Sequence, residues 1–282
     1  MVKVAAIQMS MSEDKSSNNN TAERLVREAA SNGAQIILLP ELFEGLYFCK
    51  DMDEKYFSWA NPLKNNLLIK RFAELAKELK VVVLVSYFEK ADEEYFNSLV
   101  VVNADGSIME NYRKTHIPDG PGYEEKFYFK PGDSGFKVYE TAYGKIGVGI
   151  CWDQWFCETA RALTLMGAEI IFYPTAIGSE PEIHLDSKEH WQRVQMGHAA
   201  TNTVPVVVAN RYGEEEGACC SLNFYGSSFI TDYTGAKVAE ASRNAEEILY
   251  ADFDLEDQAK QREYWGLIRD RRPEAYTKLI EV

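Results

Sequence analysis

The chain has 282 residues and a formal net charge of −14 at pH 7, with 46% hydrophobic and 26% charged residues. This is an ordinary globular composition, and the length suffices for one large α/β domain or two small ones. The acidic charge argues against nucleic-acid binding and suits either general solubility or attraction of small cations. No apolar run is long enough to span a membrane, and residues 1–9 lack the basic start and long apolar stretch of a signal peptide. We therefore expect a cytoplasmic protein with neither nucleic acid nor membrane as a partner.

Strand-like and helical patterns alternate through the first third of the chain. We expect a strand at 2–9, a helix at 21–31 that follows an asparagine cap and precedes Gly33, and a short buried strand at 35–39. The polar stretch 14–20 is short enough to be a loop before that helix. Apolar residues at helical spacing predict a helix at 65–80, and an apolar run predicts a strand at 81–88.

Hairpins interrupt this alternation in the middle of the chain. Asn-Ala-Asp-Gly at 103–106 separates strand-like residues 97–102 and 108–113, and a turn at 142–144 leads into a strand at 146–150. The remaining elements follow in order: helix 156–166, strand 169–173, helix 187–202, strand 205–210, and a strand pair at 227–231 and 236–239. We infer a single α/β domain over residues 1–282, in which helices cover two face-to-face sheets as a four-layer α-β-β-α sandwich. A Rossmann fold is disfavoured because the glycines at 147 and 149 lack a third.

The five cysteines are odd in number and unevenly spaced, and they include no C-x-x-C pair. We therefore expect neither a disulfide framework nor a zinc site.

Reactive side chains follow three of the expected strands, namely Glu41, Lys114 and Cys151. Chemistry in α/β sheets gathers beyond the carboxyl ends of strands, so these side chains are candidates for one site. Cys151 precedes a helix, whose dipole would lower the pKa of the thiol and favour the nucleophilic thiolate. A desolvated Glu41 would serve as general base, and Lys114 would stabilise an oxyanion. Taken singly, each residue has an ordinary alternative: a core cysteine, a solvated glutamate or a surface lysine. His116 is a weaker candidate, for a Cys–His pair.

The segments LPELF at 39–43, YRKTH at 112–116 and GICWD at 149–153 resemble, in this order, the Glu-Lys-Cys signature of the nitrilase (carbon–nitrogen hydrolase) superfamily. The resemblance covers essentially the whole chain. It implies an α-β-β-α sandwich and an amidohydrolase that uses a cysteine nucleophile and needs neither a metal nor an organic cofactor.

The resemblance implies further site residues. A second catalytic glutamate is matched by Glu125, with neighbouring Glu124 as the alternative, and the backbone N–H of Trp152 would bind the oxyanion. The superfamily also implies a homo-oligomer, a dimer or a larger assembly of dimers. The C-terminal tail, about residues 255–282, would pack on a neighbouring subunit, with Trp265 and the arginines at 269–272 as candidate interface residues.

Segments 173–181, 190–199 and 269–273 make the chain most similar, within the superfamily, to the N-carbamoylputrescine amidases. This similarity implies hydrolysis of a small cationic ureido substrate to putrescine, CO2 and ammonia. The ammonium tail of such a substrate needs an anion at the far end of the pocket, and Glu180 would supply it.

Two alternatives remain open at this point. An N-carbamoyl amino acid hydrolase, a β-ureidopropionase or another small-amide hydrolase would share the mechanism, and an anionic tail would need Arg or Lys in its pocket. A catalytically silent scaffold of the same fold would be expected to have lost Glu41, Lys114 or Cys151, and all of them are present.

Overall fold

The computed structural model describes residues 1–179, 185–218 and 220–281. Within these ranges the strands form two six-stranded sheets and one two-stranded sheet. The first sheet has the order β14 (Glu247–Phe253), β1 (Val2–Gln8), β2 (Ile36–Leu38), β3 (Val82–Ala91), β4 (Glu94–Val102) and β5 (Tyr112–Arg113). The second has the order β13 (Lys237–Glu240), β12 (Phe229–Thr231), β9 (Val206–Ala209), β8 (Ile170–Pro174), β7 (Gly144–Val148) and β6 (Lys137–Thr141).

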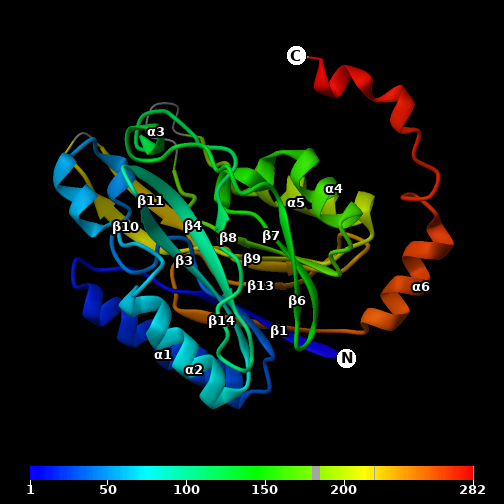
Figure 1. The fold of residues 1–282 in the computed structure, drawn as a ribbon, viewed down its shortest axis with the longest axis horizontal. Coiled ribbons are helices and arrows are strands. Elements are labelled where there is room, and N and C mark those ends of the chain that lie inside the picture. The colour runs from blue at the N-terminus through cyan, green and yellow to red at the C-terminus, as the bar shows by residue number, and fades with distance from the viewer. Residues whose placement is uncertain (180–184, 219, 282) are drawn as a thin grey trace.

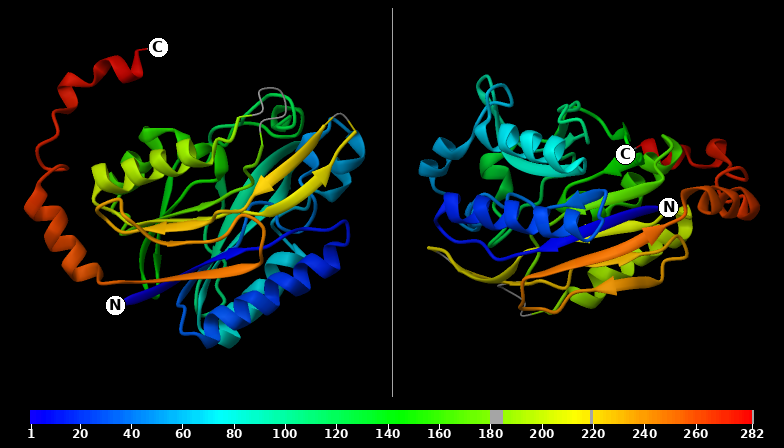
Figure 2. Two further views of the ribbon diagram at one scale, coloured as in Figure 1. Left: turned by 180° about the vertical axis from the view of Figure 1, so that it is seen from behind. Right: turned by 90° about the horizontal axis from the view of Figure 1, so that it is seen from below.

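Helices cover the outer face of each large sheet (Figure 1). The first sheet carries α1 (Lys15–Ser31) and α2 (Leu67–Leu79), and the second carries α4 (Cys157–Leu165) and α5 (Lys188–Asn202). Side chains alternate between the faces of a strand, so Ile37 of β2 packs under the helices while Ile36 and Leu38 join the core between the sheets. The predicted four-layer α-β-β-α sandwich is confirmed, as the two views of Figure 2 show.

The first helix begins at Lys15, so the prediction that residues 14–20 form a loop was wrong. The Asp14 carboxylate accepts the backbone N–H groups of Ser16 and Ser17, which caps the helix six residues before its expected start at residue 21. Serine and asparagine have a low helix propensity, which is why residues 14–20 were predicted to be a loop. The capping carboxylate of Asp14 and the burial of Asn18, which is 3% exposed, outweigh that propensity.

Several elements were not predicted. Strand β14, which adds an antiparallel edge to β1, is one of them. Strands β3 and β4 were predicted at 81–88 and 97–102, but they run further and join in an unpredicted hairpin that turns at Asp92 with a φ of 53°. The small sheet pairs β10 (Tyr212–Glu216) with β11 (Ser221–Tyr225). The acidic sequence of β10 shows little apolar alternation, which is why the pattern was missed. Among the helices of the described residues, none has both the length and the apolar character that crossing a bilayer requires.

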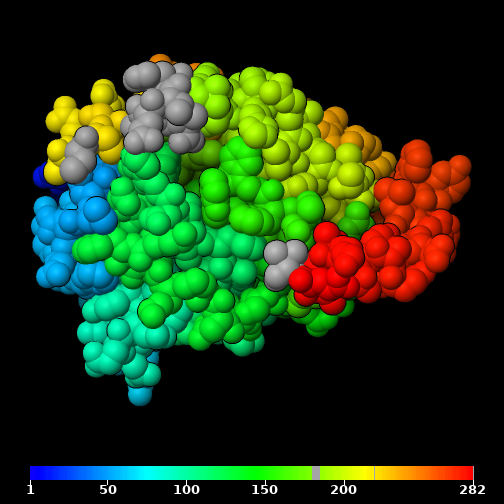
Figure 3. All heavy atoms as spheres, turned by 90° about the horizontal axis from the view of Figure 1, so that it is seen from above, coloured from blue at the N-terminus to red at the C-terminus, as the bar shows by residue number. Residues whose placement is uncertain are grey.

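The C-terminal segment leaves the sandwich after β14. Helix α6 (Leu255–Trp265) extends away from the sheets, and the chain then curves back toward α4 (Figure 1). Figure 3 shows this segment, in orange and red, projecting from one end of the molecule. A hollow of about 610 Å³ lies between it and α4, and Cys157, Arg161, Leu267 and Leu279 are among the residues that line it.

Candidate active site

Glu41, Lys114 and the Cys151 turn lie just beyond the ends of β2, β5 and β7. The Nζ atom of Lys114 donates a hydrogen bond of 2.9 Å to Oε1 of Glu41. Lys114 is 1% exposed and Glu41 is 0% exposed, so the alternatives of a surface lysine and a solvated glutamate are excluded. The structure thus brings Glu41 and Lys114 into contact, as the strand-end argument led us to expect.

A second carboxylate completes a buried chain of charges. Glu125, the first residue of α3 (Glu125–Tyr128), accepts hydrogen bonds of 2.9 and 2.7 Å from Lys114 Nζ and one of 2.7 Å from the Tyr47 hydroxyl. Glu124 is half-buried, and its backbone N–H donates to the carbonyl of Cys49. Of the two glutamates that the sequence left open, Glu125 is therefore the one that contacts Lys114.

Burial and neighbouring charges shift the pKa values of Glu125 and Lys114 in opposite directions. Burial raises the pKa of Glu125, and the charge of Lys114 partly offsets that rise. Burial disfavours the charge of Lys114, yet Glu125 and Glu41 together outweigh it and hold the pKa of Lys114 well above its usual range. The lysine is thus a permanent cation, which is what a group that stabilises an oxyanion must be.

Asn97 of β4 fixes the relative position of Glu41 and Lys114. Its side-chain Nδ2 donates to Glu41 Oε1 at 2.7 Å, and its backbone carbonyl accepts the N–H of Lys114 at 2.8 Å. Neither Asn97 nor Tyr47 was predicted as a site residue. The available signal for Asn97 was a polar side chain in an otherwise apolar stretch of strand, because a buried amide needs partners.

Cys151 begins the 3-10 helix η3 (Cys151–Trp155) with a φ of 43°, in the left-handed region that non-glycine residues rarely adopt. Such a strained turn at a strand end presents a side chain to the space beyond the sheet. Cys151 is 7% exposed. The expectation that a helix dipole lowers its pKa was wrong: burial raises the pKa of the thiol well above its usual range, and the charge of Glu41 adds to the rise. A short 3-10 turn has too little aligned backbone to overcome that desolvation.

Asp153 ties the Cys151 turn to the segment that carries Lys114. Its Oδ2 accepts the Ile150 N–H at 2.9 Å and the Tyr112 hydroxyl at 2.7 Å, and its Oδ1 accepts the His116 N–H at 2.9 Å. The imidazole Nδ1 of His116 lies 2.8 Å from the same Oδ1, and its ring stacks on Phe156 with centroids 3.7 Å apart. His116 is therefore engaged by Asp153, which argues against a Cys–His pair.

A cavity of about 160 Å³ opens onto Cys151 and Glu125. Trp152, which is 38% exposed, is among the residues that line this cavity, and the role of its backbone N–H at the oxyanion stays a prediction. The described lining is Pro118, Asp119, Gly120, Pro121, Tyr123, Glu125, Cys151, Trp152, Trp155, Ala176 and Ile177. Glu180, the residue predicted to bind the substrate tail, lies outside the described residues. Among those that are described, no cluster of His, Cys, Asp or Glu side chains is arranged to hold a metal ion.

Comparison with known proteins assigns the family. The carbon-nitrogen hydrolase family profile matches residues 3–263. The chain is 54% identical to an N-carbamoylputrescine amidase of Arabidopsis thaliana, over 99% of this chain and 95% of the relative. It is 52% identical to a citrullinase of Francisella tularensis, over 99% and 98% of the two chains. The crystal structure of a carbon-nitrogen hydrolase from Helicobacter pylori G27 superposes with a TM-score of 0.93 at 38% identity, covering 99% of this chain and 98% of that one. The chain therefore belongs to the carbon-nitrogen hydrolase family of the nitrilase superfamily.

Proposed function

We propose that the protein hydrolyses the ureido group of N-carbamoylputrescine, giving putrescine, CO2 and ammonia, with Cys151 as the nucleophile. The observation that carries this proposal is the buried Glu41–Lys114–Glu125 chain beside a thiol at the floor of a cavity. The 54% identity to the plant N-carbamoylputrescine amidase supports the choice of substrate.

In the proposed mechanism, Glu41 takes the proton of the Cys151 thiol as the sulfur attacks the ureido carbon. Lys114 and the backbone N–H of Trp152 stabilise the oxyanion of the tetrahedral intermediate. The intermediate collapses by breaking a C–N bond, and the departing nitrogen takes up the proton from Glu41, so that ammonia leaves and a carbamoyl thioester remains. Glu41 then deprotonates a water that attacks the thioester. The sulfur leaves as the thiol, and the carbamic acid decomposes to amine and CO2.

Glu125 has a supporting part in this mechanism. Its carboxylate accepts hydrogen bonds from Lys114 and from the Tyr47 hydroxyl, so it fixes the position of the ammonium group and favours its charged form. No step of the mechanism requires a metal or an organic cofactor.

The charge of the cavity supports a cationic tail. The described lining contains the carboxylates of Asp119 and Glu125 but neither lysine nor arginine, which an anionic tail would need as a partner. Asp119 pairs with the exposed Lys126 at 3.8 Å, a contact that contributes little at a solvated surface. We propose that Asp119 and Glu180 are the two candidate partners of the substrate ammonium. Asp119→Asn and Glu180→Gln are expected to raise KM for the cationic substrate more than they lower kcat.

Citrulline is a second candidate substrate, because a citrullinase is 52% identical to this chain. Its tail carries a carboxylate as well as an ammonium, which the described lining does not match. Ammonia release from N-carbamoylputrescine, citrulline and N-carbamoyl-β-alanine separates the possibilities, with Cys151→Ser as the control. Turnover of the first compound above the others supports the proposal. Preference for citrulline or for N-carbamoyl-β-alanine overturns the substrate, and release that persists in Cys151→Ser overturns the mechanism.

We also propose that the C-terminal segment, residues 255–282, packs on a second copy of the chain. Its apolar side chains are exposed in the single chain, with Trp265 at 61%, Leu279 at 68% and Ile280 at 86%. A single chain that leaves this much apolar surface in water favours association. Light scattering of the full chain is expected to give a dimer or a larger assembly. Truncation after Asp254 is expected to lower the number of chains in each particle. A monomeric full chain would contradict the proposal.

We propose a cytoplasmic location as well. The thiols of Cys49, Cys151 and Cys157 form no disulfide, which fits a reducing compartment.

A further inference from the structure

Arg211 is a fully buried arginine that the proposed mechanism does not use. It directly precedes β10, and its Nη1 pairs with Oε1 of Glu215 at 2.8 Å. Burying an ion pair is costly and seldom stabilises a fold more than apolar side chains of the same volume would. The contacts of this pair therefore call for a reason other than stability.

The guanidinium of Arg211 holds the turn that carries Glu41. Its Nη2 donates to the carbonyl of Glu41 at 2.7 Å and to that of Leu42 at 3.1 Å, and its Nη1 reaches the carbonyl of Gly45 at 3.3 Å. Leu42 has a φ of 47°, a strained value for a leucine. A planar fork of donors can hold several carbonyls of such a turn at once, whereas an ammonium group cannot match that geometry.

The partner carboxylate holds the other side of the site. Oε2 of Glu215 accepts the backbone N–H of Tyr47 at 2.6 Å, and the Tyr47 hydroxyl donates to Glu125 at 2.7 Å. Lys50 reinforces this arrangement, with its Nζ 3.1 Å from the Tyr47 carbonyl and 3.8 Å from Glu215. The Arg211–Glu215 pair thus contacts the backbone of Glu41 and the backbone of Tyr47, and Tyr47 in turn contacts Glu125.

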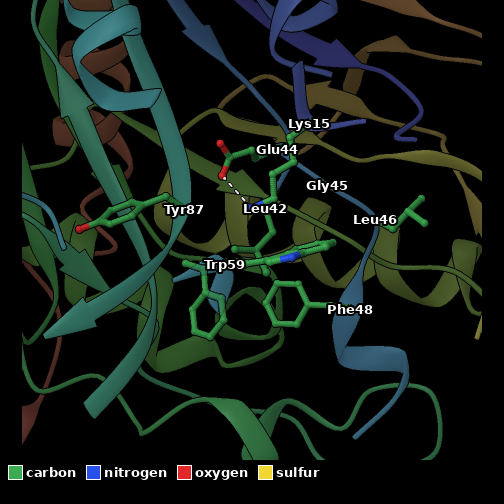
Figure 4. Close-up of a pocket in the computed structure, with 9 residues that line it drawn as sticks. Lys15, Leu42, Glu44, Gly45, Leu46, Phe48, Trp59 and Tyr87 are labelled. Carbon is green, nitrogen blue, oxygen red and sulfur yellow. Dashed lines mark ion pairs between the residues drawn. The ribbon is translucent and has the colours of Figure 1, made fainter. Parts of the chain in front are cut away.

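The outer side of the same loop has contacts of its own, among them a hydrogen bond of 3.1 Å from Asn18 Nδ2 to the carbonyl of Glu44. It faces a cavity of about 20 Å³ lined by Leu42, Glu44, Gly45 and Trp59, among others (Figure 4). The ion pair on that side joins Lys15 to Glu44 at 3.7 Å, and both side chains are partly solvated, 31% and 28% exposed. These outer contacts reach Glu44, whereas those of Arg211 reach the carbonyl of Glu41 itself.

We propose that Arg211 and Glu215 form a positioning pair that sets the distance from Glu41 and Glu125 to Lys114. This inference rests on the proposed roles of those residues as catalytic groups. Arg211→Lys keeps the charge but loses the fork, so we expect kcat to fall about 10²-fold, as for an ångström-scale displacement of a catalytic group, while KM stays within about twofold. Glu215→Gln is expected to lower kcat in the same way.

Arg262→Lys is a matched control. Arg262 is half-buried and likewise donates to two backbone carbonyls, those of Thr203 and Ala168, both at 3.2 Å, but it is not among the described residues that line the cavity. We expect its kcat to equal that of the wild type. A Tyr47→Phe variant completes a double-mutant cycle. Because both changes loosen the same contacts, the fall in kcat of Arg211→Lys with Tyr47→Phe is expected to be smaller than the product of the two single falls.

The assay must not depend on the identity of the substrate. The burst of p-nitrophenol from p-nitrophenyl acetate reports acylation of Cys151 by an activated ester, so it is measured beside ammonia release. A wild-type burst without ammonia from any ureido compound overturns the substrate and leaves this test intact. An Arg211→Lys burst rate within twofold of wild type, or a loss that Arg262→Lys reproduces, overturns the positioning pair. If the wild type shows neither activity, or if Arg211→Lys fails to fold, the crystal structure of Glu215→Gln is the test. A Tyr47–Glu125 hydrogen bond that stays at 2.7 Å overturns the inference, and loss of that bond supports it.

Discussion

Replacement of Lys114 by methionine tests whether the buried chain of charges is as tightly coupled as its geometry indicates. The change removes the ammonium group and its hydrogen bonds to Glu41 and Glu125, and leaves two carboxylates of 0% exposure facing each other. Removing one partner of a buried ion pair costs about 3–5 kcal/mol, and in a domain of this size each kcal/mol lowers Tm by roughly 2–4 °C. We expect Tm at pH 7.5 to fall by about 6–20 °C and ammonia release to be lost.

The loss of stability in Lys114→Met is expected to depend on pH. Lys114 offsets part of the rise in the pKa of Glu125, so in its absence burial and the neighbouring Glu41 raise that pKa further above its value in the unfolded chain, about 4.3. A group with a raised folded pKa contributes stability that is present below the unfolded pKa and is lost as the pH rises through the folded value. The deficit of Lys114→Met relative to wild type is therefore expected to be larger at pH 8 than at pH 5.

Thermal melts followed by circular dichroism at these pH values are the assay, and Lys114→Met with Glu125→Gln is the control. Neutralising one carboxylate removes the repulsion, so the double variant is expected to melt above the single one. A single variant within about 2 °C of wild type at both pH values would refute the reasoning, because roughly 1 kcal/mol is far below the cost of an unpaired buried charge. A double variant no more stable than the single one would do the same.

Two further predictions concern geometry. Glu125→Gln is expected to lower kcat about 10²-fold while Glu124→Gln changes it little, because Glu125 is the member of this pair that contacts Lys114. Equal losses would contradict the assignment of the second glutamate. A Cβ on Gly132 would lie 2.2 Å from the Arg113 carbonyl oxygen, beside Lys114, so Gly132→Ala is expected to lower both Tm and kcat. Gly197→Ala in α5 meets nothing within 4 Å and is expected to leave kcat unchanged and stability equal or up to about 1 kcal/mol higher, which makes it the matched control.

The sequence was sufficient for the sandwich and for the strand ends. Glu41, Lys114 and Cys151 each follow a strand whose apolar pattern or turn signal can be recognised locally, so the topology had only to bring the strand ends to one place. The order of the three motifs then added Glu125 by resemblance, and the contact with Lys114 distinguished it from Glu124.

What the sequence did not reveal depends on contacts between distant segments. Arg211 lies 170 residues from Glu41, and no local pattern indicates that its guanidinium reaches that carbonyl. The pKa of Cys151 was misjudged for the same reason. A neighbouring helix can be read from the sequence, whereas the desolvation that dominates the thiol comes from packing between the two sheets.

The raised pKa of Cys151 has a consequence for how the protein withstands oxidants. Peroxide attacks the thiolate rather than the thiol, and over-oxidation to the sulfonic acid is irreversible. A thiol that is 7% exposed and that, in the proposed mechanism, keeps its proton until Glu41 removes it during turnover gives an oxidant little to attack. We therefore expect the resting protein to outlast, in dilute hydrogen peroxide, cysteine hydrolases whose thiolate is formed before substrate binds.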